Sequence, residues 1–239
     1  EYFMATQHYE VVRDIIIEIY SHQFFENKEW PQWFMIDDYH IQQEDCHGDV
    51  VLWPLKVVGD YLRVTGDVDI LNESIGFRDI DGSISSEQRT LLEHMKYAVD
   101  TIKQRFMYDT TLISYAGGDW DDTLQPASEE LKEKLVSSWT VALTYQVIKQ
   151  LGESLEQVDK GWSKELIGLS EAINKDFNEL LIKGQVIAGF AYFENEKDME
   201  YMLHPEDNKT GIEYRLLPMT RSIISELVSK HQADMNISI

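Results

Sequence analysis

Basic residues are scarce in this chain. Of its 239 residues, 43 are acidic and only 21 are Lys or Arg, so the formal net charge is −22 at pH 7. Such a charge disfavours association with phosphate backbones and anionic lipid headgroups. The composition therefore excludes nucleic acid and membrane surfaces as expected partners. A phosphate-binding site would have to be a local exception, built from backbone amides or a few basic side chains.

Cysteine and long apolar runs are also almost absent. Cys46 is the single cysteine, which excludes an internal disulfide and suits the reducing cytoplasm. No run approaches the ~18 apolar residues of a membrane span, and no basic segment followed by an apolar one marks a signal peptide. We expect a cytoplasmic protein in which Cys46 is a buried, unreactive thiol.

What the chain does contain is enough apolar sequence for a sizeable core, at 43% of residues. Most of it recurs at helical spacing, which predicts a mainly α-helical protein. We expect helices up to about residue 21 and over 49–65, 86–106, 128–152, 162–180 and 218–228. A short strand is expected within 185–193, and 23–48 and 194–213 are expected to be loops.

Residues 117–126 contain the closest grouping of potentially functional side chains. Asp119, Asp121 and Asp122 fall within four positions, with Trp120 between the first two. Crowded carboxylates resist ionising together, so at least one should have a raised pKa. A carboxylic acid kept protonated near neutral pH can act as a general acid, and the tryptophan face suits a sugar ring. The local composition also fits a solvated acidic turn or a calcium-binding loop.

A second candidate segment lies between residues 30 and 55. Gln32 and Trp33 fall in a predicted loop, where the tryptophan could stack on a sugar, whereas Trp53 in an apolar helix is expected to belong to the core. His47 could bind a hydroxyl or a phosphate, or cap the helix that follows. Asp49 opens that helix.

Two further sets of residues leave alternatives open. Arg215 and Arg221 are the best cations for an anionic group, or else form buried ion pairs with the excess of acids. A metal site could be drawn from His40, Asp45 and His47, but their spacing matches no strong ligand pattern. We therefore expect no metal.

These segments resemble the inverting disaccharide and oligoglucan phosphorylases of glycoside hydrolase family 94. Gly-Asp-Trp-Asp-Asp at 118–122 is similar to the family's Gly-Asp-Trp-Asn-Asp, and Asp-Val-Val-Leu-Trp at 49–53 is similar to its Asp-Asp-x-Leu-Trp. Residues 214–221 also look like the oligoglucan members, with no role that the resemblance assigns. Asp121 stands where cellobiose-type members have Asn. This departure points to the β-1,2- or β-1,3-oligoglucan branch.

The resemblance implies roles for individual residues. Asp122 matches the general acid, Trp120 lines the sugar site, and Asp49 holds hydroxyls of the donor sugar. The remaining candidates for substrate binding are Trp33, Gln32, His47 and Asp119. Inorganic phosphate is implied as the nucleophile and co-substrate, with no cofactor. The family's phosphate-binding residues lie further C-terminal than this chain reaches, so the chain alone is expected to be inactive.

The resemblance also implies a fold and a reaction. We expect an all-α chain that forms part of an (α/α)6 barrel, with 1–239 as an incomplete catalytic domain cut at both ends and the full-length protein a possible homodimer. The reaction is phosphorolysis of β-linked gluco-oligosaccharides with inversion, releasing α-glucose 1-phosphate. Two alternatives stay open: an inverting (α/α)6 hydrolase in which Asp119 or Asp121 activates water, and a non-catalytic glycan-binding helical domain.

Overall fold

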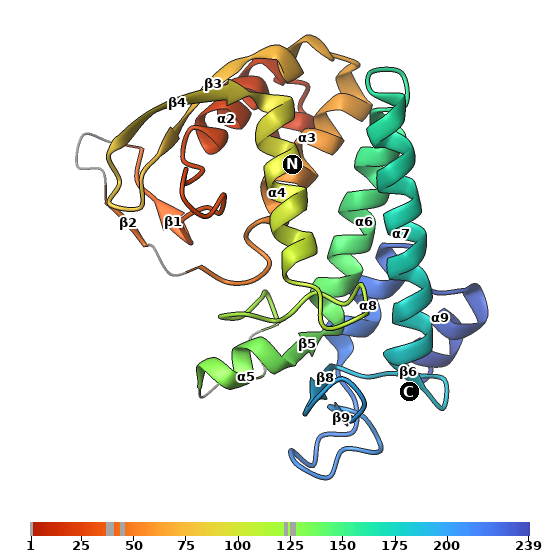
Figure 1. Cartoon of the computed structure of the whole chain (residues 1–239). Coiled ribbons are helices and arrows are strands. Elements are labelled where there is room, and N and C mark those ends of the chain that lie inside the picture. The colour runs from red at the N-terminus through yellow and green to blue at the C-terminus, as the bar shows by residue number, and fades with distance from the viewer. Residues whose placement is uncertain (1, 37–40, 44–45, 122–123, 125–127) are drawn as a thin grey trace. The chain divides into compact units, whose positions relative to one another are not determined.

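The computed structural model describes residues 2–36, 41–43, 46–121, 124 and 128–239 (Figure 1). The chain divides into two compact units, each made of separate stretches. The first unit comprises Glu1–Cys46, Val50–Gln104 and Gln150–Ser163. The second comprises His47–Asp49, Arg105–Lys149 and Lys164–Ile239. The chain therefore leaves the second unit after Asp49 and returns to it at Arg105.

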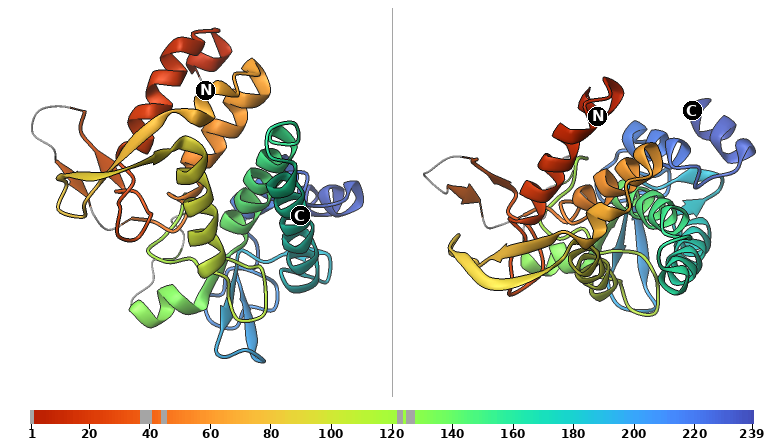
Figure 2. Two further views of the ribbon diagram at one scale, coloured as in Figure 1. Left: turned by 45° about the horizontal axis from the view of Figure 1, so that its top comes forward. Right: turned by 90° about the horizontal axis from the view of Figure 1, so that it is seen from above.

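The first unit combines helices with two antiparallel hairpins. Its elements are α1 (Tyr2–Ala5), α2 (Tyr9–Tyr20), β1 (Trp33–Phe34), β2 (Gln42–Gln43), α3 (Leu52–Thr65), the 3-10 helix η1 (Asp69–Asn72), β3 (Ser74–Arg78), β4 (Ile84–Thr90) and α4 (Leu91–Gln104). β1 pairs with β2 and β3 with β4, with Trp33 opposite Gln43 and Ser74 opposite Thr90. Figure 2 shows the β3–β4 ribbon as an arm that leads directly into α4.

The expected helices of this unit are confirmed, with shifted starts. α2 buries Val12, Ile16 and Tyr20 on one face. α3 ends at Gly66, which has a left-handed φ of 68° and whose N–H bonds to the Leu62 carbonyl, as a glycine stop requires. α3 begins at Leu52, so Asp49 precedes the helix and does not open it.

The expected start of α4 at Ser86 is wrong, because residues 84–90 form strand β4. Thr90 caps the helix instead: its hydroxyl accepts the Glu93 N–H at 3.3 Å, and its own N–H donates to the Glu93 carboxylate at 2.9 Å. This reciprocal pair is a capping box. After Ile84 strand β4 contains only polar residues, so it shows no alternation of apolar residues from which to predict it.

The second unit contains short helices, three-stranded and two-stranded sheets, and parts of two long helices that it shares with the first. Its elements are α5 (Glu129–Lys134), β5 (Leu135–Ser137), α6 (Ser138–Ser154), α7 (Lys160–Leu180), β6 (Ile182–Lys183), β7 (Val186–Ile187), β8 (Phe190–Phe193), β9 (Met199–Met202), α8 (Leu216–Ile224) and α9 (Lys230–Ile237). The antiparallel sheet has the order β5-β8-β9.

The continuous helix expected over 128–152 is broken here. Ser128 does cap α5, accepting the Leu131 N–H. Residues 135–137 then extend, because they pair with β8 and place Leu135 in a buried cluster with Tyr115, Phe190 and Leu203. Tertiary pairing thus overrides the helical periodicity of this stretch.

The last part of the chain is partly as expected. The strand within 185–193 is confirmed as β7 and β8, whereas the expected loop over 194–213 also contains β9. α9 was not expected; its first turn has a capping box between Ser229 and Gln232. A mainly helical chain is therefore confirmed, but four small sheets accompany the helices in the described residues, so the strict all-α class is not. No described helix is long and apolar enough to cross a membrane.

Candidate active site

Two segments far apart in the sequence meet in the second unit. The Gly48 N–H donates to the Gly118 carbonyl at 2.8 Å, and His47 pairs with Ala116 in an antiparallel bridge. Both glycines are needed: a Cβ on Gly48 would lie 2.5 Å from the Tyr115 carbonyl oxygen, and Gly118 has φ of +147° beside the His47 ring. Two of the segments that carry the family resemblance are therefore joined through their backbones.

Asp119, Trp120 and Asp121 alternate between the interior and the solvent. Asp119 and Asp121 are 1% and 0% exposed, whereas Trp120 is 71% exposed. Asp119 accepts the Asp121 N–H at 2.7 Å, forming a tight turn of its own, and accepts the Thr140 hydroxyl at 2.6 Å. The two buried carboxylates thus hold the segment against the protein interior, and the Trp120 indole between them is exposed to solvent.

The electrostatics of Asp119 are unusual. Burial raises the pKa of Asp119 from 3.8 to about 7, against the opposing effect of the Ser137 and Thr140 side chains and the Asp121 amide. The negative charge of Asp49, itself only 4% exposed, adds to the increase in pKa. The raised pKa predicted for one acid of this segment is confirmed for Asp119, but its main cause is burial and not the crowding that the sequence suggested.

The Asp121 carboxylate is paired with a basic side chain. One of its oxygens accepts two hydrogen bonds from Arg215, at 3.0 Å from Nε and 2.8 Å from Nη2. Arg215 immediately precedes α8, and its side chain keeps 35% of its surface exposed. Of the two roles left open for Arg215, the buried ion pair is the one observed. Arg221 instead donates to Gln146 and lies over the Trp139 ring, 5.6 Å from its centroid.

Tyr115 supports the same segment from the core. Its ring is fully buried and packs edge-on against Phe190, with centroids 5.1 Å apart. Its hydroxyl donates to the carbonyls of Leu124 at 2.9 Å and Asp121 at 3.4 Å. Sequence reasoning missed Tyr115 and Thr140, which belong to no recognisable motif, and it did not identify Asp121 as the partner of Arg215.

The predicted site residues are distributed over both units. His47, Asp49, Asp119 and Trp120 all belong to the second unit. Gln32 and Trp33 belong to the first, where the Gln32 N–H donates to the Gln43 carbonyl at 2.9 Å and Trp33 is about half exposed. Asp122, the predicted general acid, lies outside the described residues.

Two expectations about single side chains need correction. Trp53 was expected in the core but is 38% exposed, because it sits in the first turn of α3 on the face opposite Leu52 and Leu55. Cys46 was expected to be buried but is half-buried, with its Sγ 3.7 Å from a Glu29 carboxylate oxygen.

The metal-binding interpretations gain no support from the described part of the chain. There, no three His, Cys, Asp or Glu side chains are grouped to hold a metal ion. His40 and Asp45 lie outside the described residues. Calcium needs six to eight oxygen ligands, whereas Asp119 and Asp121 direct oxygens to internal donors and to Arg215.

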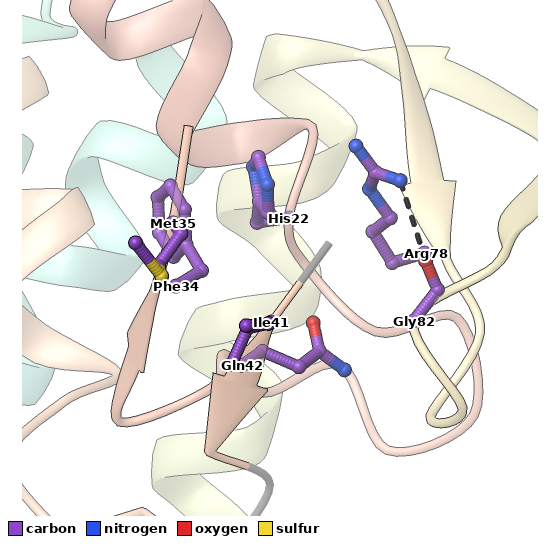
Figure 3. Close-up of a pocket in the computed structure, with 7 residues that line it drawn as sticks. All are labelled: His22, Phe34, Met35, Ile41, Gln42, Arg78 and Gly82. Atoms are coloured by element: carbon purple, nitrogen blue, oxygen red, sulfur yellow. Dashed lines mark hydrogen bonds between the residues drawn. The ribbon is translucent and has the colours of Figure 1, made fainter. Parts of the chain in front are cut away.

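The first unit has a small pocket of its own that the sequence did not indicate (Figure 3). The His22 ring stacks on Phe34 with centroids 3.8 Å apart, and Arg78 donates to the Gly82 carbonyl at 3.3 Å. Its lining residues are His22, Phe34, Met35, Ile41, Gln42, Arg78 and Gly82. None of them is a predicted site residue.

Comparison with known proteins adds independent information. Residues 13–233 match the family described as "Glycosyl hydrolase 94 superfamily, catalytic domain". The chain is 50% identical over 242 aligned positions to a 1,2-beta-oligoglucan phosphorylase of Listeria innocua serovar 6a, covering 100% of this chain and 22% of that protein. It is 26% identical over 170 positions to a solabiose phosphorylase of Paenibacillus borealis, covering 70% of this chain and 20% of that protein. The chain thus spans about a fifth of the length of these relatives.

Proposed function

The chain belongs to the glycosyl hydrolase 94 superfamily, and from this premise we propose that it is part of the catalytic domain of a longer inverting phosphorylase. The substrates are β-linked gluco-oligosaccharides and inorganic phosphate, and the product is α-glucose 1-phosphate. The observation that carries the proposal is the 50% identity, over the whole chain, to a 1,2-beta-oligoglucan phosphorylase. It also favours β-1,2 over β-1,3 linkages.

The proposed mechanism uses one catalytic carboxylic acid. Asp122 protonates the glycosidic oxygen of the leaving saccharide, and phosphate attacks the anomeric carbon from the opposite face. Trp120 offers an exposed aromatic face to a sugar ring. Asp49, His47, Trp33 and Gln32 are the other proposed substrate-binding residues, and Asp119, which accepts hydrogen bonds from protein groups, is instead proposed to hold the Trp120 segment in place. Phosphate is the nucleophile, so no second carboxylate is needed to activate water.

The geometry of the second unit disfavours the hydrolase alternative. An inverting hydrolase needs a base that faces a water molecule, about 6.5–9.5 Å from the acid. Asp119 and Asp121 are 1% and 0% exposed, and both accept hydrogen bonds from protein groups. Carboxylates enclosed in this way are suited to holding the segment in place, and poorly suited to activating a water at the sugar.

The finer parts of the expected architecture belong to the same proposal. The helices of the two units would contribute part of an (α/α)6 barrel that is completed by the rest of the enzyme. The single cysteine supports a cytoplasmic location, and the charge of −22 argues against nucleic acid and membranes as partners. We propose no cofactor, and a homodimer for the complete protein.

The test is the release of glucose 1-phosphate by the complete enzyme. With β-1,2-linked glucan and phosphate, the wild type should release it, and Asp122→Asn should be slower by roughly 10²–10⁴-fold, the usual contribution of a general acid. Asp100→Asn, an exposed carboxylate on α4, is the matched control and should retain activity. Glucose release without phosphate would indicate a hydrolase, and binding without turnover would indicate a glycan-binding domain. Full activity of Asp122→Asn would remove Asp122 from the mechanism.

A further inference from the structure

The segment 214–221 received no role from the sequence, and the contact made by Arg215 supplies one. We propose that Arg215 is a positioning residue for catalysis: by holding the buried carboxylate of Asp121, it fixes the peptide between the exposed Trp120 and Asp122. This inference rests on the proposed role of Asp122 as the general acid.

The contact joins two distant parts of the second unit. Arg215 and Asp121 are 94 residues apart in the sequence, and two guanidinium nitrogens converge on one carboxylate oxygen. The Asp121 side chain has no exposed surface, whereas Arg215 remains 35% exposed. A two-point contact from a planar guanidinium fixes orientation as well as distance. Residue 121 is therefore restrained both in position and in rotation.

The rest of Asp121 is held as well. Its N–H donates to Asp119 at 2.7 Å, and its carbonyl accepts the Tyr115 hydroxyl at 3.4 Å. Asp119 is in turn held by Thr140. The N–H and the carbonyl of residue 121 thus both have partners from nearby stretches, and Arg215 supplies a positively charged partner for the side chain.

That charge explains why the residue between Trp120 and Asp122 can be an aspartate. An asparagine at this place, as in the Gly-Asp-Trp-Asn-Asp form, carries no charge and needs no cation. Removing one member of a buried ion pair is strongly destabilising, so loss of the Arg215 cation should loosen the arrangement that it holds. An error of about 1 Å in the placement of a catalytic group can lower the rate on the order of 100-fold. The predicted defect is therefore in turnover.

The test is a double-mutant cycle in the complete enzyme with Arg215→Gln, Asp121→Asn and the two combined, measured as phosphate-dependent release of glucose 1-phosphate. Arg215→Gln should lower kcat on the order of 100-fold, with KM for phosphate and oligosaccharide within about threefold, since a mispositioned acid affects turnover and not ground-state binding. Asp121→Asn in the same chain should restore at least about tenfold of the loss, because it removes the buried charge that Arg215 contacted.

The matched control is Arg63→Gln. Arg63 also contacts an aspartate, Asp60 at 3.3 Å, but its side chain is 64% exposed, and this change should leave kcat unaltered. Should Arg215→Gln fail to fold, Arg215→Lys keeps the charge but loses the two-point contact, and it should give a smaller kcat defect that Asp121→Asn does not relieve.

Three outcomes would overturn the inference. A raised KM for phosphate with unchanged kcat would make Arg215 a phosphate ligand. A double variant as slow as Arg215→Gln would show that Arg215 does not act through Asp121. Wild-type kcat in Arg215→Gln would show that the contact is dispensable. These are distinct from failure of the proposed function, in which the wild type itself would release no glucose 1-phosphate.

Discussion

The aspartates that form ion pairs in the first unit are more exposed than the aspartates near residues 117–121 of the second unit. In the first, Asp60 lies beside Lys56 and Asp67 beside Arg13, with 22% and 29% of the carboxylate side chains still exposed. In the second, Asp49, Asp119 and Asp121 are at most 4% exposed and belong to one neighbourhood. Burying acids is costly, and the second unit concentrates that cost around residues 117–121. Strained electrostatics of this kind are typical of functional sites.

The first unit also buries a titratable group, but a neutral one. His94 has no exposed surface, and its ring stacks on Phe77 with centroids 4.0 Å apart. Burial lowers the pKa of His94 from 6.5 to about 4, and the nearby Lys28 acts in the same direction. The ring is therefore uncharged at neutral pH. The contrast predicts that Asp119 and His94 make contributions to stability that change in opposite directions with pH.

The largest expected effect concerns Asp119. Its folded-state pKa of about 7 lies above the ordinary value of 3.8, so the folded state retains the proton more firmly. The stability that this contributes is full below pH 4 and is lost as the pH rises to 7, up to roughly 4 kcal/mol. As the pH is raised from 4 to 8, the stability of Asp119→Asn should therefore increase relative to that of the wild type, measured by thermal melting of the enzyme. The exposed control Asp100→Asn should show no such trend, and a parallel pH profile for Asp119→Asn would contradict the comparison.

The next effect concerns His94 and has the opposite sign. Its folded pKa of about 4 lies below the ordinary value of 6.5, so stability is fully present above pH 6.5 and falls as the pH drops to 4. The expected loss is roughly 3 kcal/mol. His94→Gln loses the ring stacking and should melt lower at pH 7, but its melting temperature should fall less between pH 7 and pH 4. His8→Gln, at an exposed histidine of the same unit, is the control. Equal changes in melting temperature with pH for His94→Gln and the wild type would contradict the lowered pKa of His94.

The smallest effect concerns the partly exposed ion pairs of the first unit. Arg13 contacts Asp67 at 3.4 Å and also bonds to Glu73, with all three side chains partly in solvent. Arg13→Met should cost at most about 1 kcal/mol of stability, and the cost should shrink in high salt. Urea unfolding at low and high salt measures both. A cost as large as that of breaking a buried pair, about 3 kcal/mol or more, would remove the distinction between the units.

Much of the helical scaffold could be predicted from the sequence because apolar stripes decide it. Val12, Ile16 and Tyr20 fall on one buried face of α2, and the stripe from Leu91 to Ile102 does so in α4. What could not be predicted depends on pairing between distant segments. Strand β4 carries no apolar alternation, and β5 lies within a helical pattern that its pairing with β8 overrides.

The candidate site is likewise predictable where it depends on local sequence and not where it depends on contacts between distant segments. The concentration of acids at 119–122 is visible in the sequence, and so is the expectation that one has a raised pKa. That this acid is Asp119 depends on its burial and on the nearby charge of Asp49, 70 residues away, neither of which the sequence shows. The approach of His47 and Asp49 to this segment depends on Gly48 and Gly118, whose small size has meaning only once the contact is known.

The Arg105 side chain donates to the Gly48 carbonyl at 3.0 Å across 57 residues, and Gly48 in turn bonds to Gly118. The stretch Val50–Gln104 therefore departs from and returns to nearly the same point of the second unit. The entropy of closing such a loop grows only slowly with its length, by about 0.6 kcal/mol for each doubling. Extra residues between α3 and α4 should therefore add little to the entropy of closing this loop. The junction of Gly48, Arg105 and Gly118 fixes where the two ends of this stretch meet.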